Sequence, residues 1–214
     1  MNNKLLVNYL ILTVTSLLLG CGGSAKDENK SDTQSGSTPA GQKYMINTKE
    51  SVITWEGSML IASAEEHAGY VYPSKGELIL DKGQLVGGSV EIDMNTIEYK
   101  DRQHKNSPVM HLKSPDFFDV EKFPTAAFVI TGVAPANDGN IKVTGNLTIK
   151  GITKAVTFPA GIEVKDGVAK ASGKLVIDRT EWGIRYKSGK FYDIIADETV
   201  SDDIELLMEI VAGK

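Results

Sequence analysis

Apolar and polar residues alternate along most of the chain from Tyr44 to its end. In residues 90–95, for example, Val, Ile and Met alternate with Glu, Asp and Asn. A period of two is typical of a β-strand, because successive side chains point to opposite faces. Each such run therefore predicts a strand with one face buried in a core. The apolar positions of the other runs are Phe128 and Ile130, Ile141 and Val143, Leu147 and Ile149, Val156 and Phe158, Leu175 and Ile177, and every second residue from Ile204 to Ile210.

Short turn motifs separate these runs, at a spacing that suits antiparallel hairpins. About eight or more strands over roughly 170 residues, joined by short connections, predict an all-β fold, either an up-and-down antiparallel barrel or a sandwich. A parallel α/β sheet is not expected, because no helical pattern alternates with the strands. The turn motifs are Asp81-Lys82-Gly83, Gly87-Gly88, Asn137-Asp138-Gly139-Asn140, Lys150-Gly151 and Asp166-Gly167.

Residues 101–119 are the one stretch of this region without alternation. Proline at 108 and again at 115 limits any helix there, because proline inside a helix removes a hydrogen bond and clashes with the preceding turn. We expect a long loop that carries one or two helical turns.

Residues 1–20 have the pattern of a signal peptide. Lys4 supplies a short basic region, and the apolar stretch from Leu5 to Leu19 is too short for a comfortable membrane span. The stretch ends in Leu-Leu-Gly-Cys, which resembles the lipobox of bacterial lipoproteins. We therefore expect Cys21 to carry a diacylglyceryl group that anchors the protein on a membrane, and the alternative is an ordinary secretory signal followed by a chance cysteine.

Residues 22–43 are rich in glycine, serine and charge, a composition typical of a flexible tether. The predicted organisation is thus a signal peptide at 1–20, a lipidated cysteine and tether at 21–43, and one globular domain at 44–214. The expected location is the cell envelope, as a lipoprotein of the outer membrane that faces the periplasm or the cell surface.

Composition narrows the function of that domain. With 214 residues, of which 41% are hydrophobic, the chain can bury one core of ordinary size. The formal net charge of −5 argues against a nucleic-acid partner. The single cysteine leaves no partner within the chain for a disulfide.

Motifs for metal binding or catalysis are missing from the sequence. His104 and His111 are seven residues apart, His67 lies elsewhere, and Pro108 interrupts the helix that would align the first two. No nucleophile elbow, phosphate-binding glycine loop, H-E-x-x-H pair or C-x-x-C pair is found. We therefore predict no metal, no resident cofactor and no enzymatic activity, and a hydrolase acting on a lipid or glycan is the least favoured alternative.

Four segments of the domain carry recognisable motifs. Residues 111–124 read HLKSPDFFDVEKFP, residues 143–154 read VTGNLTIKGITK, residues 177–184 read IDRTEWGI and residues 200–204 read VSDDI. Together they resemble the YceI-like family of bacterial periplasmic lipid-binding proteins, because they come in the family's order and span nearly the whole domain. There are two departures: Ser51 stands where many members have a His-Ser pair, and Pro108-Val109-Met110 stands where many have Arg-Asp before the His-Leu.

The resemblance implies an extended, lipocalin-like antiparallel barrel that binds an isoprenoid quinone, a polyprenyl compound or a fatty amphiphile. Members of the family can pair into dimers around long ligands, so a homodimer is one expectation. For Arg179 we favour bracing of a neighbouring strand over contact with a head group. A second function class stays open, a non-catalytic interaction domain with a filled core. The candidate ligand-binding residues are Trp55, Phe117, Phe118, Phe128, Phe158, Arg179, Trp182 and Tyr186.

Overall fold

The computed structural model describes residues 40–58, 66–101, 108–193 and 199–214. All of them belong to one compact unit, residues 37–214. The predicted signal peptide, Cys21, most of the predicted tether and His104 lie outside the described residues. Those interpretations stay predictions.

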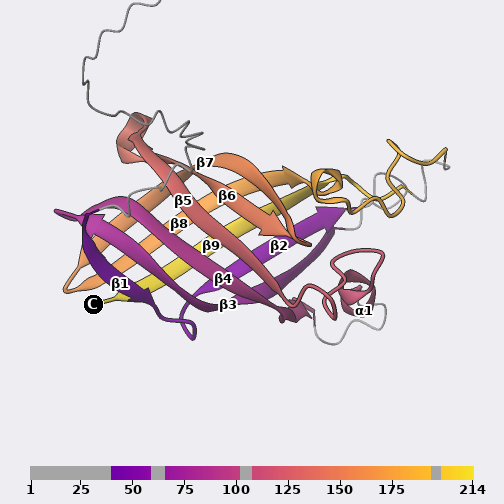
Figure 1. The fold of residues 1–214 in the computed structure, drawn as a ribbon, viewed down its shortest axis with the longest axis horizontal. Coiled ribbons are helices and arrows are strands. Elements are labelled where there is room, and N and C mark those ends of the chain that lie inside the picture. The colour runs from indigo at the N-terminus through magenta and orange to yellow at the C-terminus, as the bar shows by residue number, and fades with distance from the viewer. Residues whose placement is uncertain (1–39, 59–65, 102–107, 194–198) are drawn as a thin grey trace, which may run out of the picture. The chain divides into compact units, whose positions relative to one another are not determined.

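Strands dominate the described part of the chain, as the alternation predicts (Figure 1). The first strand begins at Gln42, two residues before the predicted start of the domain. In chain order the elements are β1 (Gln42–Ile46), β2 (Val52–Ser58), β3 (Glu66–Asp81), β4 (Gln84–Tyr99), α1 (Val109–Lys113), β5 (Thr125–Pro135), the 3-10 helix η1 (Asn137–Gly139), β6 (Ile141–Ile149), β7 (Ile152–Lys165), β8 (Val168–Asp178), the 3-10 helix η2 (Arg179–Trp182) and β9 (Asp203–Gly213).

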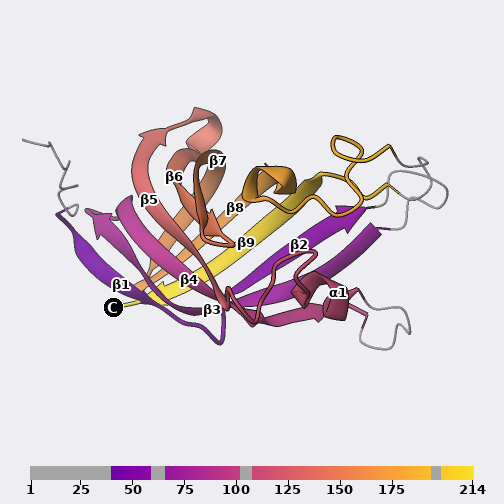
Figure 2. The same ribbon diagram turned by 45° about the vertical axis from the view of Figure 1, so that its right-hand side comes forward.

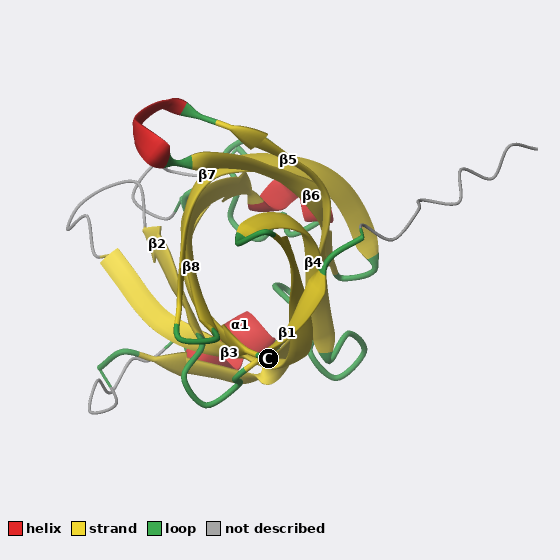
Figure 3. Cartoon of the chain, turned by 90° about the vertical axis from the view of Figure 1, so that its left-hand side faces the viewer, coloured by secondary structure: helices red, strands yellow, loops and turns green. Residues whose placement is uncertain are grey.

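The strands form one closed antiparallel sheet. From β2 onward, each strand pairs with the strand that follows it in the chain. β1 and β2 lie one after the other between β3 and β9. Each of them pairs with both β3 and β9. In the described residues the sheet thus has eight strand positions, one of them shared by β1 and β2, and Figure 3 shows the resulting ring. The up-and-down barrel is confirmed, and the sandwich alternative is wrong.

Ser51 holds the interruption between β1 and β2 in place. Its side chain is buried, and its hydroxyl donates to the carbonyl oxygen of Val211 at 3.2 Å and accepts from the amide of Val211 at 2.9 Å. The amide of Asn47 donates to the same carbonyl at 2.8 Å. These bonds satisfy the β9 backbone where the ladder is broken. Ser51, which stands where many family members have a His-Ser pair, therefore has a structural role.

Four of the five predicted turn motifs connect neighbouring strands, and the fifth does not. Lys82 and Gly83, at φ values of 49° and 81°, form the tight turn between β3 and β4. Gly87 and Gly88 instead lie within β4, next to a shift in register against β3. Gly88 has a φ of 153°, and a Cβ there would lie 2.6 Å from the carbonyl oxygen of Glu77. The expected turn is wrong because this glycine serves a bulge and a close approach of two strands.

The segment between β4 and β5 contains the short helix that the prolines predict. α1 begins directly after Pro108 and ends at Ser114. The following loop sends Phe117 and Val120 into the core, where both side chains are buried. Figures 1 and 2 show α1 and η2 at the same end of the barrel, which we call the α1 end. The opposite end, which carries the β3–β4 turn, is called the Lys82 end.

No helix within the described ranges is long and apolar enough to span a membrane.

Candidate functional site

The barrel encloses a cavity of about 430 Å³. All nine strands contribute to its lining, together with residues from the α1 segment and from the segment between η2 and β9. Cavities that hold small ligands measure about 300–1,000 Å³. The barrel core is therefore hollow and large enough for a ligand.

The alternation in the sequence correctly predicts most of this lining, because one face of every strand must point inward in a closed barrel. On β4 the inward residues include Val90, Ile92 and Met94, and on β9 they are the alternate residues from Ile204 to Ile210. Further predicted positions on the lining are Phe128, Ile130, Val143, Leu147, Ile149, Phe158, Leu175 and Ile177.

Aromatic rings lie flat on this lining where a neighbouring strand carries glycine. A Cβ added at Gly145 would lie 2.3 Å from the ring of Phe128, and one added at Gly173 would lie 3.0 Å from the ring of Phe158. The two rings pack against each other with centroids 5.6 Å apart. Because the glycines remove side-chain volume beneath the rings, the rings occupy the wall and not the barrel axis. This arrangement helps to keep the core hollow.

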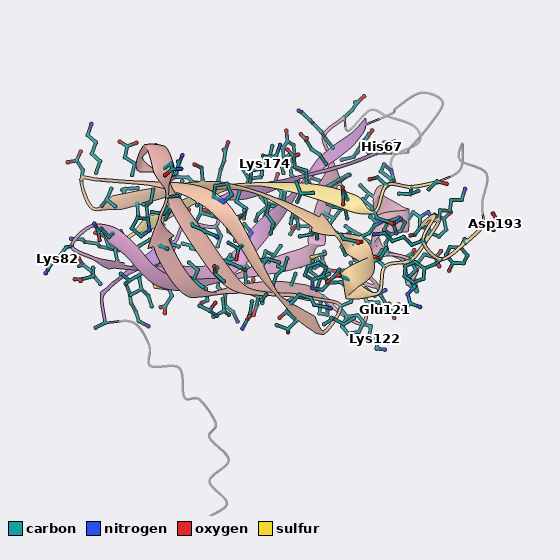
Figure 4. All side chains as sticks on the ribbon, turned by 90° about the horizontal axis from the view of Figure 1, so that it is seen from above. His67, Lys82, Glu121, Lys122, Lys174 and Asp193 are labelled. Carbon is teal, nitrogen blue, oxygen red and sulfur yellow. The ribbon has the colours of Figure 1, made fainter. Side chains whose placement is uncertain are left out.

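Polar lining residues gather at the α1 end. They include His67, His111, Arg179 and Lys187, whereas Ser89 and Ser172 are the polar residues among the rest of the described lining. Figure 4 shows His67 near the same end of the barrel as Asp193, with Lys82 at the other end. Beyond the cavity toward the Lys82 end, buried residues fill the core, namely Tyr44, Leu80, Ala169 and Ala212. The lining is thus largely apolar, with its charged and imidazole side chains at one end and two serine hydroxyls elsewhere.

Phe117, Phe118 and Tyr186, three of the candidate ligand-binding residues, form an aromatic cluster at the α1 end. The ring of Phe117 lies 5.4 Å from that of Tyr186 and 6.5 Å from that of Phe118. His111 packs edge-on against Tyr186 at 4.3 Å, so α1 is fastened to the segment that follows η2. All four residues line the cavity.

Arg179 is fully buried beside this cluster. Its Nε donates to the carbonyl of Ser201 at 2.8 Å, Nη1 to Ile184 at 2.9 Å and Nη2 to Val200 at 3.0 Å. Asp202 lies 3.2 Å from Nη2 and offsets its charge. These bonds tie the segments on both sides of η2 to the start of β9, so Arg179 braces this part of the barrel.

The electrostatics around η2 follow from burial and pairing. Burial lowers the pKa of Arg179, and the carboxylates of Asp202 and Asp178 oppose that shift. Burial acts to raise the pKa of Asp178, but hydrogen bonds from Lys190 and Thr180 outweigh it and hold that pKa below its ordinary value. Lys190 lies 2.5 Å from Asp178, and this hydrogen bond raises the pKa of the lysine. The carboxylate of Asp178 and the ammonium of Lys190 therefore stabilise each other.

Trp182, one of the candidate ligand-binding residues, does not lie at the cavity. It is 3% exposed but is not on the cavity lining. Its Nε1 donates to the carbonyl of Leu147 at 3.2 Å, which directs the indole into the wall between η2 and β6. Trp182 therefore packs the core behind the lining, and the expectation that it forms part of the cavity wall is wrong. Trp55, Phe117, Phe118, Phe128, Phe158, Arg179 and Tyr186 do line the cavity, and their contact with a ligand stays a prediction.

Sequence reasoning missed Gly57 and His67, and considered His67 only as a metal ligand. The two residues pair across β2 and β3, and both line the cavity. Glycine carries no hydrophobic signal, and the pairing joins residues from separate strands. A strict count of every second position from Ile53 through Trp55 would have placed Gly57 on the inner face.

Side chains at the cavity do not form a metal site in the described part of the chain. No group of three or more His, Cys, Asp or Glu residues lies close enough there to hold a metal ion. Asp203, the acidic residue of the described lining, is exposed at the start of β9. This arrangement supports a binding site for an apolar group.

A family model for the YceI-like domain matches residues 44–212. The chain belongs to the YceI-like domain family. This result confirms the resemblance noted in the sequence, and the matched residues cover the barrel almost from end to end. The YceI-like barrel described above is therefore the fold of a known family.

Two relatives and one solved structure show how far the YceI-like likeness extends. A UPF0312 protein of Shewanella denitrificans is 34% identical over 122 residues, which cover 54% of this chain and 63% of that protein, less than two thirds of its length. Protein YceI of Salmonella newport is 28% identical over 204 residues, which cover 95% of each chain. A polyisoprenoid binding domain from Saccharophagus degradans, described as implicated in plant cell wall breakdown, matches with a TM-score of 0.57 at 9% identity, over 79% of this chain and 97% of that one. At that identity the structural likeness shows a shared fold.

Proposed function

We propose that this YceI-like protein binds the apolar tail of a long-chain lipid inside its barrel, and that it sequesters or carries that lipid in the cell envelope. The observation that carries the proposal is the hollow, apolar core of about 430 Å³. Removing a hydrocarbon tail from water contributes about 25 cal/mol per Å² buried, before the costs of association. Because the lining is almost entirely apolar, it suits a hydrocarbon tail. Binding of such a tail requires no catalytic group.

The distribution of polar residues supports one orientation of the ligand. The charged and imidazole side chains of the lining, among them His67 and His111, lie at the α1 end, and the rest of the described lining is apolar except for Ser89 and Ser172. A lipid would therefore place its tail along the apolar part and its head group at the α1 end.

The ligand class rests on chemistry and on one named neighbour. An isoprenoid quinone, a polyprenyl compound or a fatty amphiphile each has the required tail. The likeness to a polyisoprenoid binding domain supports this class. A filled core would have favoured the interaction-domain alternative, and the hollow barrel favours binding.

Lipid retention in a variant with a blocked cavity tests the proposal. Ala171 lines the cavity, so Ala171→Phe should occupy the space of the tail. Lys170→Phe is the matched control, because Lys170 is the exposed neighbour on the same strand. We expect organic extraction to release lipid from the wild type and from Lys170→Phe, and at least about tenfold less from Ala171→Phe. Equal amounts from the three folded proteins would place the lipid outside the barrel and contradict the proposal.

The envelope location is part of the proposal and rests on the lipobox at Cys21. A diacylglyceryl anchor followed by a flexible tether would keep the barrel beside a membrane that supplies the lipid. We expect the wild type to sediment with membranes and to incorporate labelled fatty acid, and Cys21→Ser to do neither. Unchanged membrane association and labelling in Cys21→Ser would contradict the anchor and leave the barrel's lipid binding to be judged separately.

A further inference from the structure

We propose that a recess beside Gly57 binds an uncharged oxygen acceptor, such as a carbonyl oxygen, in the head group of the lipid. The recess is the part of the cavity bounded by Trp55, Gly57 and His67. This inference rests on the proposed lipid-binding function and names the head-group chemistry that the site selects.

The space for the head group comes from the glycine. Gly57 lies two residues beyond Trp55 on β2, so both face the cavity. A Cβ added at Gly57 would meet no atom within 4 Å. Across the strand pair, Gly57 is opposite His67. The wall therefore has open space at Gly57, next to Trp55 on the same strand and His67 on the neighbouring strand.

The first donor is the indole of Trp55. Its Nε1 is buried and has no hydrogen-bond partner in the described part of the protein. An indole N–H can only donate, and a buried donor without an acceptor is costly. The outer side of the ring is closed, because a Cβ added at Gly69 would lie 2.4 Å from the indole and the ring of Tyr99 stacks on it at 6.4 Å. An acceptor for Nε1 must therefore come from the cavity.

The second polar group is the imidazole of His67. Its Nδ1 lies 3.0 Å from the hydroxyl of Tyr99, and this contact fixes the ring at the edge of the recess. When the Tyr99 hydroxyl donates to Nδ1, Nε2 carries the ring proton and is a second donor. In that tautomer His67 and Trp55 would each offer one N–H group at the recess, which suits an oxygen with two lone pairs.

The buried charge at this end of the cavity favours an uncharged head group over a phosphate. Of the two cationic side chains of the described lining, Arg179 is fully buried and its three nitrogens already donate to backbone carbonyls. The other, Lys187, is half-buried, and its ammonium lies 6.0 Å from the centre of the Tyr186 ring. Asp202 lies within 3.2 Å of Arg179 and offsets its charge. A phosphate would have to break these bonds, whereas a carbonyl oxygen needs only the donors of the recess.

Binding of matched probes to the full chain tests the inference. The probes are a long-chain methyl ketone, the alkane of the same chain length and the corresponding alkyl phosphate, each measured by displacement of a fluorescent alkyl probe. We expect the wild type to bind the ketone more tightly than the alkane or the phosphate. Trp55→Phe removes the N–H but keeps an aromatic ring, and should weaken ketone binding about tenfold while changing alkane binding less than about twofold.

Two further variants separate the recess from general packing. Trp182→Phe is the matched control, because Trp182 is not on the lining and its indole N–H already donates to the backbone carbonyl of Leu147, so this variant should leave the ketone preference intact. Gly57→Val fills the recess without changing Trp55, and should abolish that preference. Equal binding of ketone and alkane by the wild type, or equal loss of both in Trp55→Phe, would overturn the inference while the lipid-binding function stands. No displacement by any of the three probes would overturn both.

Discussion

The indole Nε1 of Trp182 lies 3.2 Å from the carbonyl oxygen of Leu147, so η2 is joined to the last part of β6 by a buried hydrogen bond. Trp182→Phe removes the donor and leaves that carbonyl without this bond in a dry environment. We expect the free energy of unfolding to fall by about 1–3 kcal/mol, measured by chemical denaturation. In Trp55→Phe the lost N–H had no partner, so its stability should change less, and a larger loss there than in Trp182→Phe would contradict these assignments.

The strands from β4 to β9 could be predicted because their inward faces are marked by apolar residues at every second position. Leu147 and Ile149 on β6 illustrate this, since both were expected in a core and both line the cavity. The hairpin at Lys150 and Gly151 was also predictable, because its residues allow the left-handed backbone that tight turns need. The local residue pattern was sufficient to predict these strands and this turn.

The polar end of the cavity could not be predicted, because it depends on contacts between distant segments. Arg179 meets Val200 and Ser201 only after the chain has turned at η2 and returned to β9. Gly57 and His67 become neighbours only through the pairing of β2 with β3. Neither of these two contacts produces a periodic pattern in the sequence. The number of residues between the two partners also differs from one contact to the other.

Arg179 supports the segments around η2, and its removal should be severe. Arg179→Leu deletes three hydrogen bonds to backbone carbonyls and the ion pair with Asp202, which keeps only its contact with Lys190 at 3.4 Å. We expect a loss of about 3–5 kcal/mol in the free energy of unfolding. Arg179→Lys should rescue little of this, because an ammonium cannot reproduce the planar fork. Thermal unfolding of both variants checks this, and a lysine variant close to wild-type stability would contradict the bracing role.

The hydrogen bond between Asp178 and Lys190 should make stability depend on pH in the acid range. Because the pKa of Asp178 is lowered in the folded protein, its contribution is present above the ordinary aspartate pKa of about 3.9. It is lost as the pH falls through the lowered value. Asp178→Asn should therefore be less stable than the wild type at pH 7, by about 1 kcal/mol, and this difference should shrink below pH 4. Denaturation at a series of pH values checks the prediction, and a difference that grows in acid would contradict it.

The glycine beneath Phe158 should affect the size of the cavity. At Gly173 an added Cβ would press on the ring of Phe158 at 3.0 Å and on the methyl group of Met208 at 3.3 Å. Gly173→Ala should push both side chains toward the barrel axis and weaken binding of the longest chains about fourfold, the equivalent of one buried methylene. Gly161→Ala is the control, because the nearest atom to its added Cβ is at an ordinary 3.4 Å. Displacement titrations with alkyl ligands of increasing length check the prediction, and equal affinities in both variants would contradict it.

The mass of the intact protein, as purified from its cell envelope, tests the central claim most directly. Native mass spectrometry should show the polypeptide together with one additional molecule that organic solvent releases and that has a long apolar tail. A species at the mass of the polypeptide and its covalent modifications alone, unchanged after incubation with an excess of long-chain lipid, would contradict lipid binding by the barrel.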